Sequence, residues 1–152
     1  MSAGTVADHG DPFDLRRFVE AQESIHGTAL AELKAGRKRT HWMWFVFPQV
    51  QGLGNSPMAV KFSVKSREEA RRYLEHPLLG VRLRECADAV HAFEGRSASD
   101  IFGYPDDLKL KSSMTLFESV AEPGSVFGKV LEKYFQGEKD VRTLEVLQAM
   151  KT

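Results

Sequence analysis

The stretch Leu79-Gly80-Val81-Arg82-Leu83-Arg84-Glu85-Cys86-Ala87-Asp88-Ala89-Val90-His91-Ala92-Phe93 decides the fold class. Its apolar residues recur three or four positions apart, the spacing that places side chains on one face of a helix. That face comprises Leu79, Leu83, Cys86, Ala87, Val90 and Phe93. Pro77 just before the stretch and Gly95 just after it are typical helix boundaries. We therefore expect an amphipathic helix, with Cys86 as a buried structural thiol rather than a nucleophile.

Helical patterns continue on both sides of this stretch. Ser66 and Glu69 have the spacing of a capping box before a helix that runs to about Glu75. His76 is expected to cap the next helix. Further helix starts are indicated at Asp14, Ser99, Pro105, Ser125 and Asp140. The sequence thus predicts a mainly α protein, a compact single-domain bundle of six to eight helices with short loops.

The length and composition limit the class of protein. The 152-residue chain fits one domain, and we expect residues 11–150 to form a single α-helical domain after a disordered N-terminal tail at 1–10. Its 21 basic and 21 acidic residues argue against non-specific binding of nucleic acid. One cysteine excludes an intramolecular disulfide. No apolar run approaches the roughly 18 residues of a membrane span, so we expect a cytoplasmic protein without a membrane partner.

The run from His41 to Phe47 permits two interpretations. Its aromatic and β-branched residues favour a strand, for which residues 62–64 could supply a weak partner. An isolated pair of strands is only marginally stable, however, and nothing else in the chain resembles a strand. We prefer a short buried helix that Pro48 ends.

The most unusual segment lies between Leu33 and Arg67, which contains no acidic residue. Its seven basic residues are Lys34, Arg37, Lys38, Arg39, Lys61, Lys65 and Arg67. Both tryptophans lie in it, and in a helix Trp42 and Trp44 would point about 200° apart, one into the core and one toward a pocket. Basic groups beside aromatic rings suit an anionic, ring-bearing ligand. The alternative is ordinary: cations complement a helix C-terminus, and tryptophans fill a core.

Two further segments extend this candidate pocket. The loop from Gln49 to Ser56 lacks the pattern of a phosphate loop or of a dinucleotide fingerprint, although its glycines expose backbone that a ligand could contact. From Asp106 to Thr115, polar residues follow one face of a predicted helix. Hydroxyl groups inside a helix are unfavourable by propensity, which suggests a role in binding. The alternative is an amphipathic helix with one wet side.

The candidate site residues follow from these three segments. The ligand-binding candidates are Arg37, Lys38, His41, Trp42, Trp44, Gln49, Gly52, Gly54, Ser56, Lys109, Ser112 and Thr115. His41 and Asp106 are the candidates for a general base, although nothing in the sequence fixes their geometry. The histidines lack His-x-x-x-His and Glu-x-x-His spacing, so neither a metal nor another cofactor is expected.

Three motifs carry a resemblance to a known family. They are His41-Trp42-Met43-Trp44-Phe45-x-Phe47-Pro48-Gln49-x-x-Gly52-Leu53-Gly54-x-Ser56, Tyr73-Leu74-x-His76-Pro77-x-Leu79-Gly80 and Asp106-x-x-Lys109-Leu110-x-Ser112-x-Met114-Thr115-Leu116-Phe117. With shorter matches from about Asp11 to Leu147, they resemble the bacterial domain-of-unknown-function family numbered 1810. The resemblance implies a small, mainly helical, stand-alone domain and supplies no established chemistry. Members are sometimes labelled calpastatin, which does not fit a chain with this compact, apolar-periodic pattern.

The leading functional hypothesis is a protein that binds, and in one version also processes, a small anionic ligand of nucleotide-like or ADP-ribose-like chemistry. The rival hypothesis is a non-catalytic interaction module for a protein or single-stranded nucleic acid. The neutral net charge of the chain disfavours nucleic acid as the partner. In a third, the aromatic residues are mainly core. Whether the protein is an enzyme stays open at this point.

Overall fold

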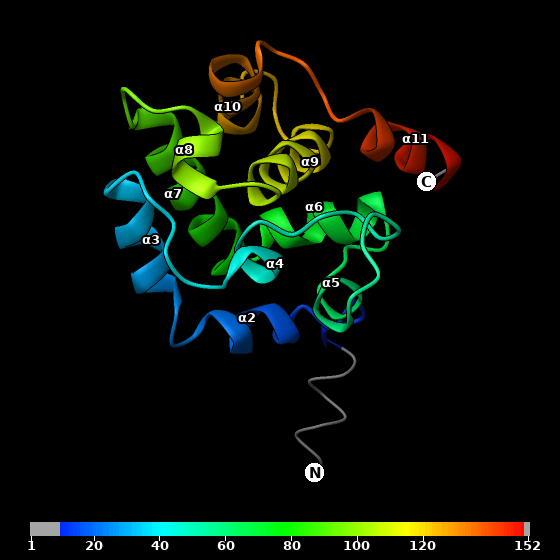
Figure 1. Ribbon diagram of the computed structural model, residues 1–152. Coiled ribbons are helices and arrows are strands. Elements are labelled where there is room, and N and C mark those ends of the chain that lie inside the picture. Colours follow the sequence, from blue (N-terminus) through cyan, green and yellow to red (C-terminus); the bar gives the residue numbers. More distant parts are fainter. Residues whose placement is uncertain (1–9, 151–152) are drawn as a thin grey trace.

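The computed structural model describes residues 10–150, which contain ten helices in the order shown in Figure 1. They are α2 Arg16–Gln22, α3 His26–Lys34, α4 Met43–Val46, α5 Pro57–Lys61, α6 Arg67–Glu75, α7 Leu79–Ala92, α8 Ala98–Phe102, α9 Asp106–Glu118, α10 Val126–Phe135 and α11 Val141–Met150. The mainly α class is confirmed. The expected six to eight helices were too few, since a separate α3 and the five-residue α5 were not expected. The expected N-terminal tail lies outside the described residues, apart from Gly10.

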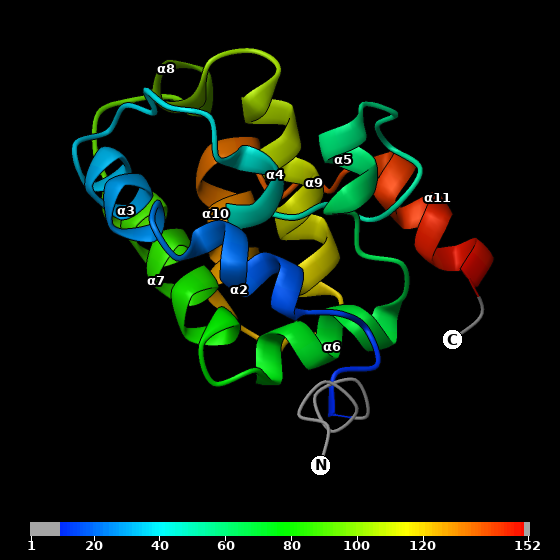
Figure 2. The ribbon, with the colours of Figure 1, turned by 90° about the horizontal axis from the view of Figure 1, so that it is seen from below.

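Helices α7 and α9 organise the bundle. Helix α9 lies near the middle of the molecule in both views and packs against α6, α8, α10 and α11 (Figures 1 and 2). Helix α7 packs against α3, α6 and α10. Aromatic pairs in T-shaped or tilted contact connect α2, α6, α9 and α10: Phe18 with Tyr73, Tyr73 with Phe117, and Phe117 with Phe127, at centroid distances of 5.1, 5.3 and 5.9 Å. The core is therefore continuous from α2 to α10.

The predicted apolar stripe of α7 forms part of this core. Five of its six residues are buried on α7, and the sixth, Phe93, directly follows the helix and is half-buried. Cys86 is completely buried, and burial raises the pKa of its thiol to about 12. At Gly80 a Cβ atom would lie 2.0 Å from the Leu74 carbonyl oxygen. This close approach of α6 and α7 requires glycine.

The ambiguous run forms a helix. Residues Met43–Val46 are helical, which confirms the preferred interpretation. Pairing with residues 62–64 also occurs, but further along the chain, where Val50 and Val64 form an isolated parallel bridge. Val64 N donates to Gln49 O at 2.9 Å, and Gln51 N donates to Val64 O at 2.9 Å. Within residues 10–150 this bridge is the only β-type pairing.

Several predicted helix caps are confirmed. Ser66 Oγ and Asp140 Oδ2 each accept a backbone N–H at the start of their helix. His76 Nδ1 accepts the N–H groups of Leu78 and Leu79 at 3.1 and 3.2 Å. All three caps satisfy donors that lack an intrahelical partner.

Other predicted caps were wrong. Asp14 has a left-handed φ of 54°, and the carboxylate of Asp11 instead accepts the N–H groups of Leu15 and Arg16. Ser97, rather than Ser99, caps α8. Both errors arose because two residues of capping type stand close together.

Among residues 10–150, no helix has the length and apolar character needed to cross a membrane.

Candidate functional site

Asp106, the first residue of α9, holds two of the predicted lysines. Lys38 Nζ lies 2.9 Å from Asp106 Oδ2, and Lys109 Nζ lies 3.5 Å from Oδ1. The Lys38 side chain is only 7% exposed and also donates to Thr40 O at 2.7 Å. One carboxylate therefore faces two ammonium groups, and the cluster carries an excess positive charge.

Each of these lysines lies over a tryptophan ring. Lys38 Nζ is 5.0 Å from the ring centroid of Trp42, and Lys109 Nζ is 5.5 Å from that of Trp44. Both distances are within the range of cation–π attraction. Trp42 is completely buried and Trp44 is half-buried, so the expectation that one ring enters the core is confirmed. Lys38, Trp44, Asp106 and Lys109 are referred to below as the Trp44–Lys109 surface.

Glu32, which sequence analysis missed, positions the loop that carries Lys38. Its buried carboxylate accepts hydrogen bonds from Arg39 N, Thr40 N, Thr40 Oγ1 and Trp42 Nε1, at 2.9, 3.2, 2.8 and 2.8 Å. Burial alone would raise the pKa of Glu32, but these hydrogen bonds outweigh burial, so its pKa is lowered. A signal existed in the sequence: Glu32 lies three residues after Ala29, on the apolar stripe of α3.

The chain turns sharply between Glu32 and Lys38. Gly36 has a φ of +76°, and a Cβ atom there would lie 2.2 Å from the ring of Phe93. This confirms its predicted position after a helix end. Lys38 N then donates to Ile101 O at 2.7 Å, which fixes the loop against α8. The side chain of Arg37 is left exposed.

The predicted hydroxyl groups of α9 are engaged within the protein. Ser112 Oγ donates to Leu108 O at 3.2 Å, and Thr115 Oγ1 donates to Lys111 O at 2.8 Å. Thr115 Oγ1 also accepts Asp140 N at 2.9 Å and so joins α9 to the start of α11. Both residues are buried. Their observed contacts are structural.

The loop from Gln49 to Ser56 contacts α5, α11 and the chain around Val64. Ser56 Oγ caps α5 by accepting Ala59 N at 3.2 Å. The carbonyl of Gly52 accepts a hydrogen bond from Arg142 of α11 at 3.4 Å. Gly54 is exposed, and the half-buried Gln49 uses its carbonyl in the bridge to Val64.

The two candidate bases differ in their surroundings. His41 is exposed, and its ring makes no hydrogen bond or ion pair with any residue in the described range 10–150. Asp106 is the ion-pair partner of both lysines. Within the same range, no cluster of three or more histidine, cysteine or acidic side chains could hold a metal ion.

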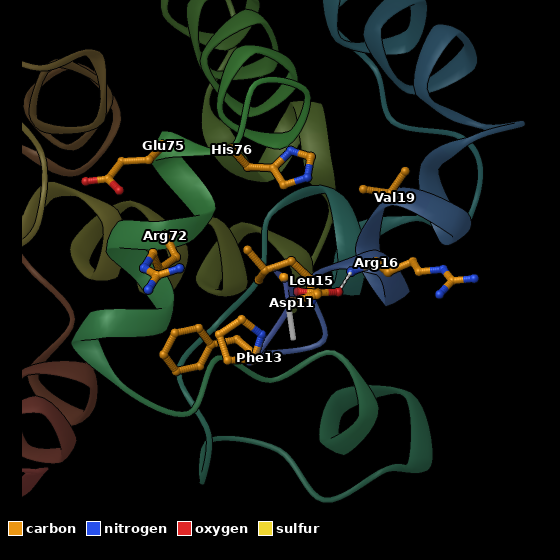
Figure 3. Close-up of a pocket in the computed structure, with 10 residues that line it drawn as sticks. Asp11, Phe13, Leu15, Arg16, Val19, Arg72, Glu75 and His76 are labelled. Carbon is orange, nitrogen blue, oxygen red and sulfur yellow. Dashed lines mark hydrogen bonds between the residues drawn. The ribbon is translucent and has the colours of Figure 1, made fainter. Parts of the chain in front are cut away.

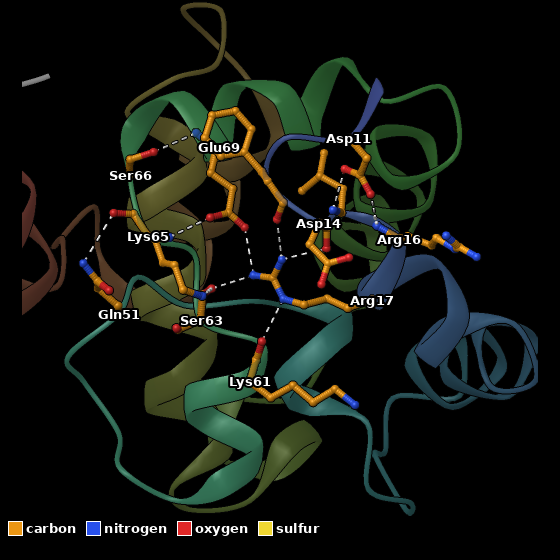
Figure 4. A network of polar contacts seen from close by, with 12 residues as sticks. Asp11, Asp14, Arg16, Arg17, Gln51, Lys61, Ser63, Lys65, Ser66 and Glu69 are labelled. Carbon is orange, nitrogen blue, oxygen red and sulfur yellow. Dashed lines mark hydrogen bonds and ion pairs between the residues drawn. The ribbon is translucent and has the colours of Figure 1, made fainter. Parts of the chain in front are cut away.

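The other end of the basic segment is held by an arginine. Figure 4 shows Arg17 at the centre of a network in which its guanidinium donates to Glu69 Oε2 at 2.8 Å. It also donates to four carbonyl groups, those of Phe13, Asp14, Lys61 and Ser63. Both side chains of the ion pair are almost completely buried. This network joins α2 to the chain between α5 and α6.

The described cavities lie away from the Trp44–Lys109 surface. One of about 530 Å³ lies between the start of α2 and the end of α6, where Phe13, Arg72 and His76 line it (Figure 3). Because His76 Nδ1 accepts from α7, the proton of its neutral ring is on Nε2. Asp11, also in this cavity, uses both carboxylate oxygens to cap α2.

Comparison with known proteins identifies relatives without a described function. The model of a family described as "Protein of unknown function (DUF1810)" matches residues 12–147. The chain is similar to a solved structure, that of the conserved hypothetical protein Rv1873 from Mycobacterium tuberculosis. The two are 54% identical with a TM-score of 0.89, over 91% of this chain and 99% of the other. No match is found among curated proteins.

Proposed function

This chain belongs to the DUF1810 family of proteins of unknown function, and we propose that it binds a small anionic, ring-bearing ligand of nucleotide-like or ADP-ribose-like chemistry. Within the Trp44–Lys109 surface, Lys38, Trp44 and Lys109 are the binding residues. Arg37 and His41, both exposed on the adjoining loop, are the outer contacts of the proposed ligand.

One observation carries the proposal: the Lys109 ammonium lies 5.5 Å above the ring of the half-exposed Trp44. An ammonium group can hold a phosphate, and an indole face can stack against a base. Lys109 is also the less tightly held lysine, since it lies 3.5 Å from Asp106 whereas Lys38 lies 2.9 Å away. A ligand anion would therefore draw Lys109 from Asp106 and leave Lys38 in place.

Binding is favoured over catalysis by the state of the two candidate bases. Asp106 is paired with two ammonium groups, and nothing in the described chain orients the ring of His41. General acid–base catalysis requires a group held within reach of the proton that it transfers. We therefore assign Asp106 to positioning the two lysines.

Thermal unfolding in the presence of nucleotides and ADP-ribose tests the proposal. A ligand at a hundred times its dissociation constant stabilises a protein by about 2.7 kcal/mol and so raises the melting temperature. Lys109→Ala and Trp44→Ala should abolish this rise. Lys111→Ala is the matched control, because Lys111 is also on α9 and lies 5.8 Å from another ring, that of Phe135. A rise that survives both site variants, or no rise with any phosphorylated metabolite, contradicts the proposal.

The second candidate function is the interaction module. The observation that favours it is that the described cavities lie elsewhere, while Arg37, Arg39 and His41 are exposed on the chain just before the half-buried Trp44. An open basic surface with an aromatic ring suits a single-stranded nucleic acid. The test is retention of a single-stranded nucleic acid by the protein. Retention that weakens steeply as salt is added, and that is lost in Trp44→Ala, would favour this function over the first.

A further inference from the structure

A second polar cavity lies at the start of α10, on the part of the molecule formed by α9, α10 and the chain before α11. Its volume is about 310 Å³, at the lower end of the range for small-molecule sites, roughly 300–1,000 Å³. Ser125, Gly128, Lys129 and Lys139 are among the residues that line it. None of these residues belongs to the Trp44–Lys109 surface.

The cavity contains a helix N-terminus whose donors are free. Helix α10 has ten residues, and within the described chain no acceptor is hydrogen-bonded to the N–H groups of Val126, Phe127 and Gly128. Such unpaired N–H groups and the partial positive charge of the helix end favour an anion.

An independent observation concerns Ser125, which stands at the N-cap position of α10. The residue is only 3% exposed, yet its Oγ has no hydrogen-bond partner in the described chain. Its side chain does not cap the helix. A buried hydroxyl group without a partner is costly, so Ser125 favours a ligand that offers it an acceptor.

Side-chain charges around the cavity limit which anion fits. Lys129 and Lys139 supply two cations, and Glu118 and Glu132 supply two carboxylates. Glu118 Oε1 pairs with Lys139 Nζ at 3.2 Å, and a Cβ atom at Gly128 would lie 3.6 Å from Glu118 Cγ. The Glu118 carboxylate therefore stands beside the helix end without hydrogen-bonding to it, and it would repel a bound anion.

We propose that the start of α10 binds a phosphate group, either as inorganic phosphate or as part of a small phosphomonoester. The phosphate oxygens accept the free N–H groups of α10 and the Ser125 hydroxyl, and Lys139 turns from Glu118 toward the ligand. Because Glu118 opposes the anion, we expect weak binding. This site is separate from the proposed nucleotide-like site and does not depend on it.

Amide NMR during titration with inorganic phosphate tests the proposal. The Val126, Phe127 and Gly128 signals should shift and saturate, whereas the indole signal of Trp44 reports the other site. Ser125→Ala should weaken phosphate binding about tenfold, the effect of one hydrogen bond to a charged group. Glu118→Gln should tighten binding, because it removes a negative charge beside the phosphate. A small phosphomonoester in a second titration shows which source of phosphate binds more tightly.

Ser113→Ala is the matched control, since Ser113 is the other buried serine without a partner and does not line the cavity. It should leave phosphate binding unchanged. In phosphate-free buffer, Ser125→Ala should unfold at the same temperature as the parent or higher, because no hydrogen bond is lost. Amide signals of α10 that do not respond to phosphate would overturn the proposal. It would also be overturned if Ser125→Ala lowered the stability and left phosphate binding intact.

Discussion

Glu32 and Glu69 are both buried, and they lie just outside the two ends of the basic segment between Leu33 and Arg67. They are neutralised differently. Glu32 accepts four hydrogen bonds, all from backbone N–H groups, a hydroxyl and an indole. Glu69 pairs with the guanidinium of Arg17 and accepts the N–H of Lys65.

The difference explains where the positive charge of the basic segment goes. Because neutral donors satisfy Glu32, no cation is needed there, and Lys38 turns instead to Asp106. At the other end the cation comes from Arg17, outside the segment, so the lysines between 61 and 65 stay exposed. A segment without acids in sequence is thus bordered by acids in space, and of its seven basic residues Lys38 is the one that belongs to the Trp44–Lys109 surface.

Arg17→Ala should have the largest effect on stability. The change leaves the buried Glu69 carboxylate without its cation and removes the guanidinium donor from four carbonyl groups. Removing one partner of a buried ion pair costs about 3–5 kcal/mol, which urea unfolding would measure. Arg16→Ala is the control. The Arg16 side chain pairs with Glu20 in solvent, so its removal should lower the free energy of unfolding by less than about 1 kcal/mol. Equal losses in the two variants would contradict the special role of Arg17.

Glu32→Gln should cost less, about 2–3 kcal/mol. With the amide oxygen in the place of Oε1, three of the four donors keep their acceptor, while the amide nitrogen takes the place of Oε2 and the Thr40 hydroxyl loses its acceptor. Urea unfolding would again measure the loss, with Glu20→Gln, a change at an exposed carboxylate, as its control. If Glu32→Gln lowered the free energy of unfolding more than Arg17→Ala, the expected order of the two contributions to stability would be contradicted.

The smallest expected effect is a pH dependence that comes from Glu32 alone. Since its folded-state pKa lies below the ordinary value of 4.5, its contribution to stability is complete above that value and is lost as the pH falls through the folded pKa. The stability difference between the parent and Glu32→Gln should therefore narrow in acid. Unfolding measured from neutral pH to pH ~3 tests this sign. A difference that widens in acid would show that the pKa of Glu32 is raised.

Local sequence patterns predicted those helices in which apolar residues recur with a clear helical spacing. The α7 stripe follows from helical geometry alone, because it depends on residues a few positions apart. The burial of one tryptophan and the partial exposure of the other were also expected, although Trp42 precedes the first residue of α4. The number of helices did not follow, since short helices such as α5 are set by their packing and caps.

The contacts of the candidate site could not be predicted in the same way. Lys38 and Asp106 are far apart in sequence, and Trp44 meets Lys109 only because α4 packs near α9. The hydroxyl of Thr115 was an expected ligand contact, but in the folded chain it joins α9 to α11. Hydrophobic periodicity indicates which face is buried, but it does not indicate which polar partner a distant loop brings.

Cys86 gives the molecule a built-in probe of its core. It is the single cysteine of the chain, lies completely inside α7, and has a thiol pKa of about 12. A thiol-alkylating reagent can reach Cys86 only when α7 separates from α3, α6 and α10, because those helices pack against α7. The rate at which Cys86 is alkylated therefore reports how often the helical bundle opens, without any substitution in the protein.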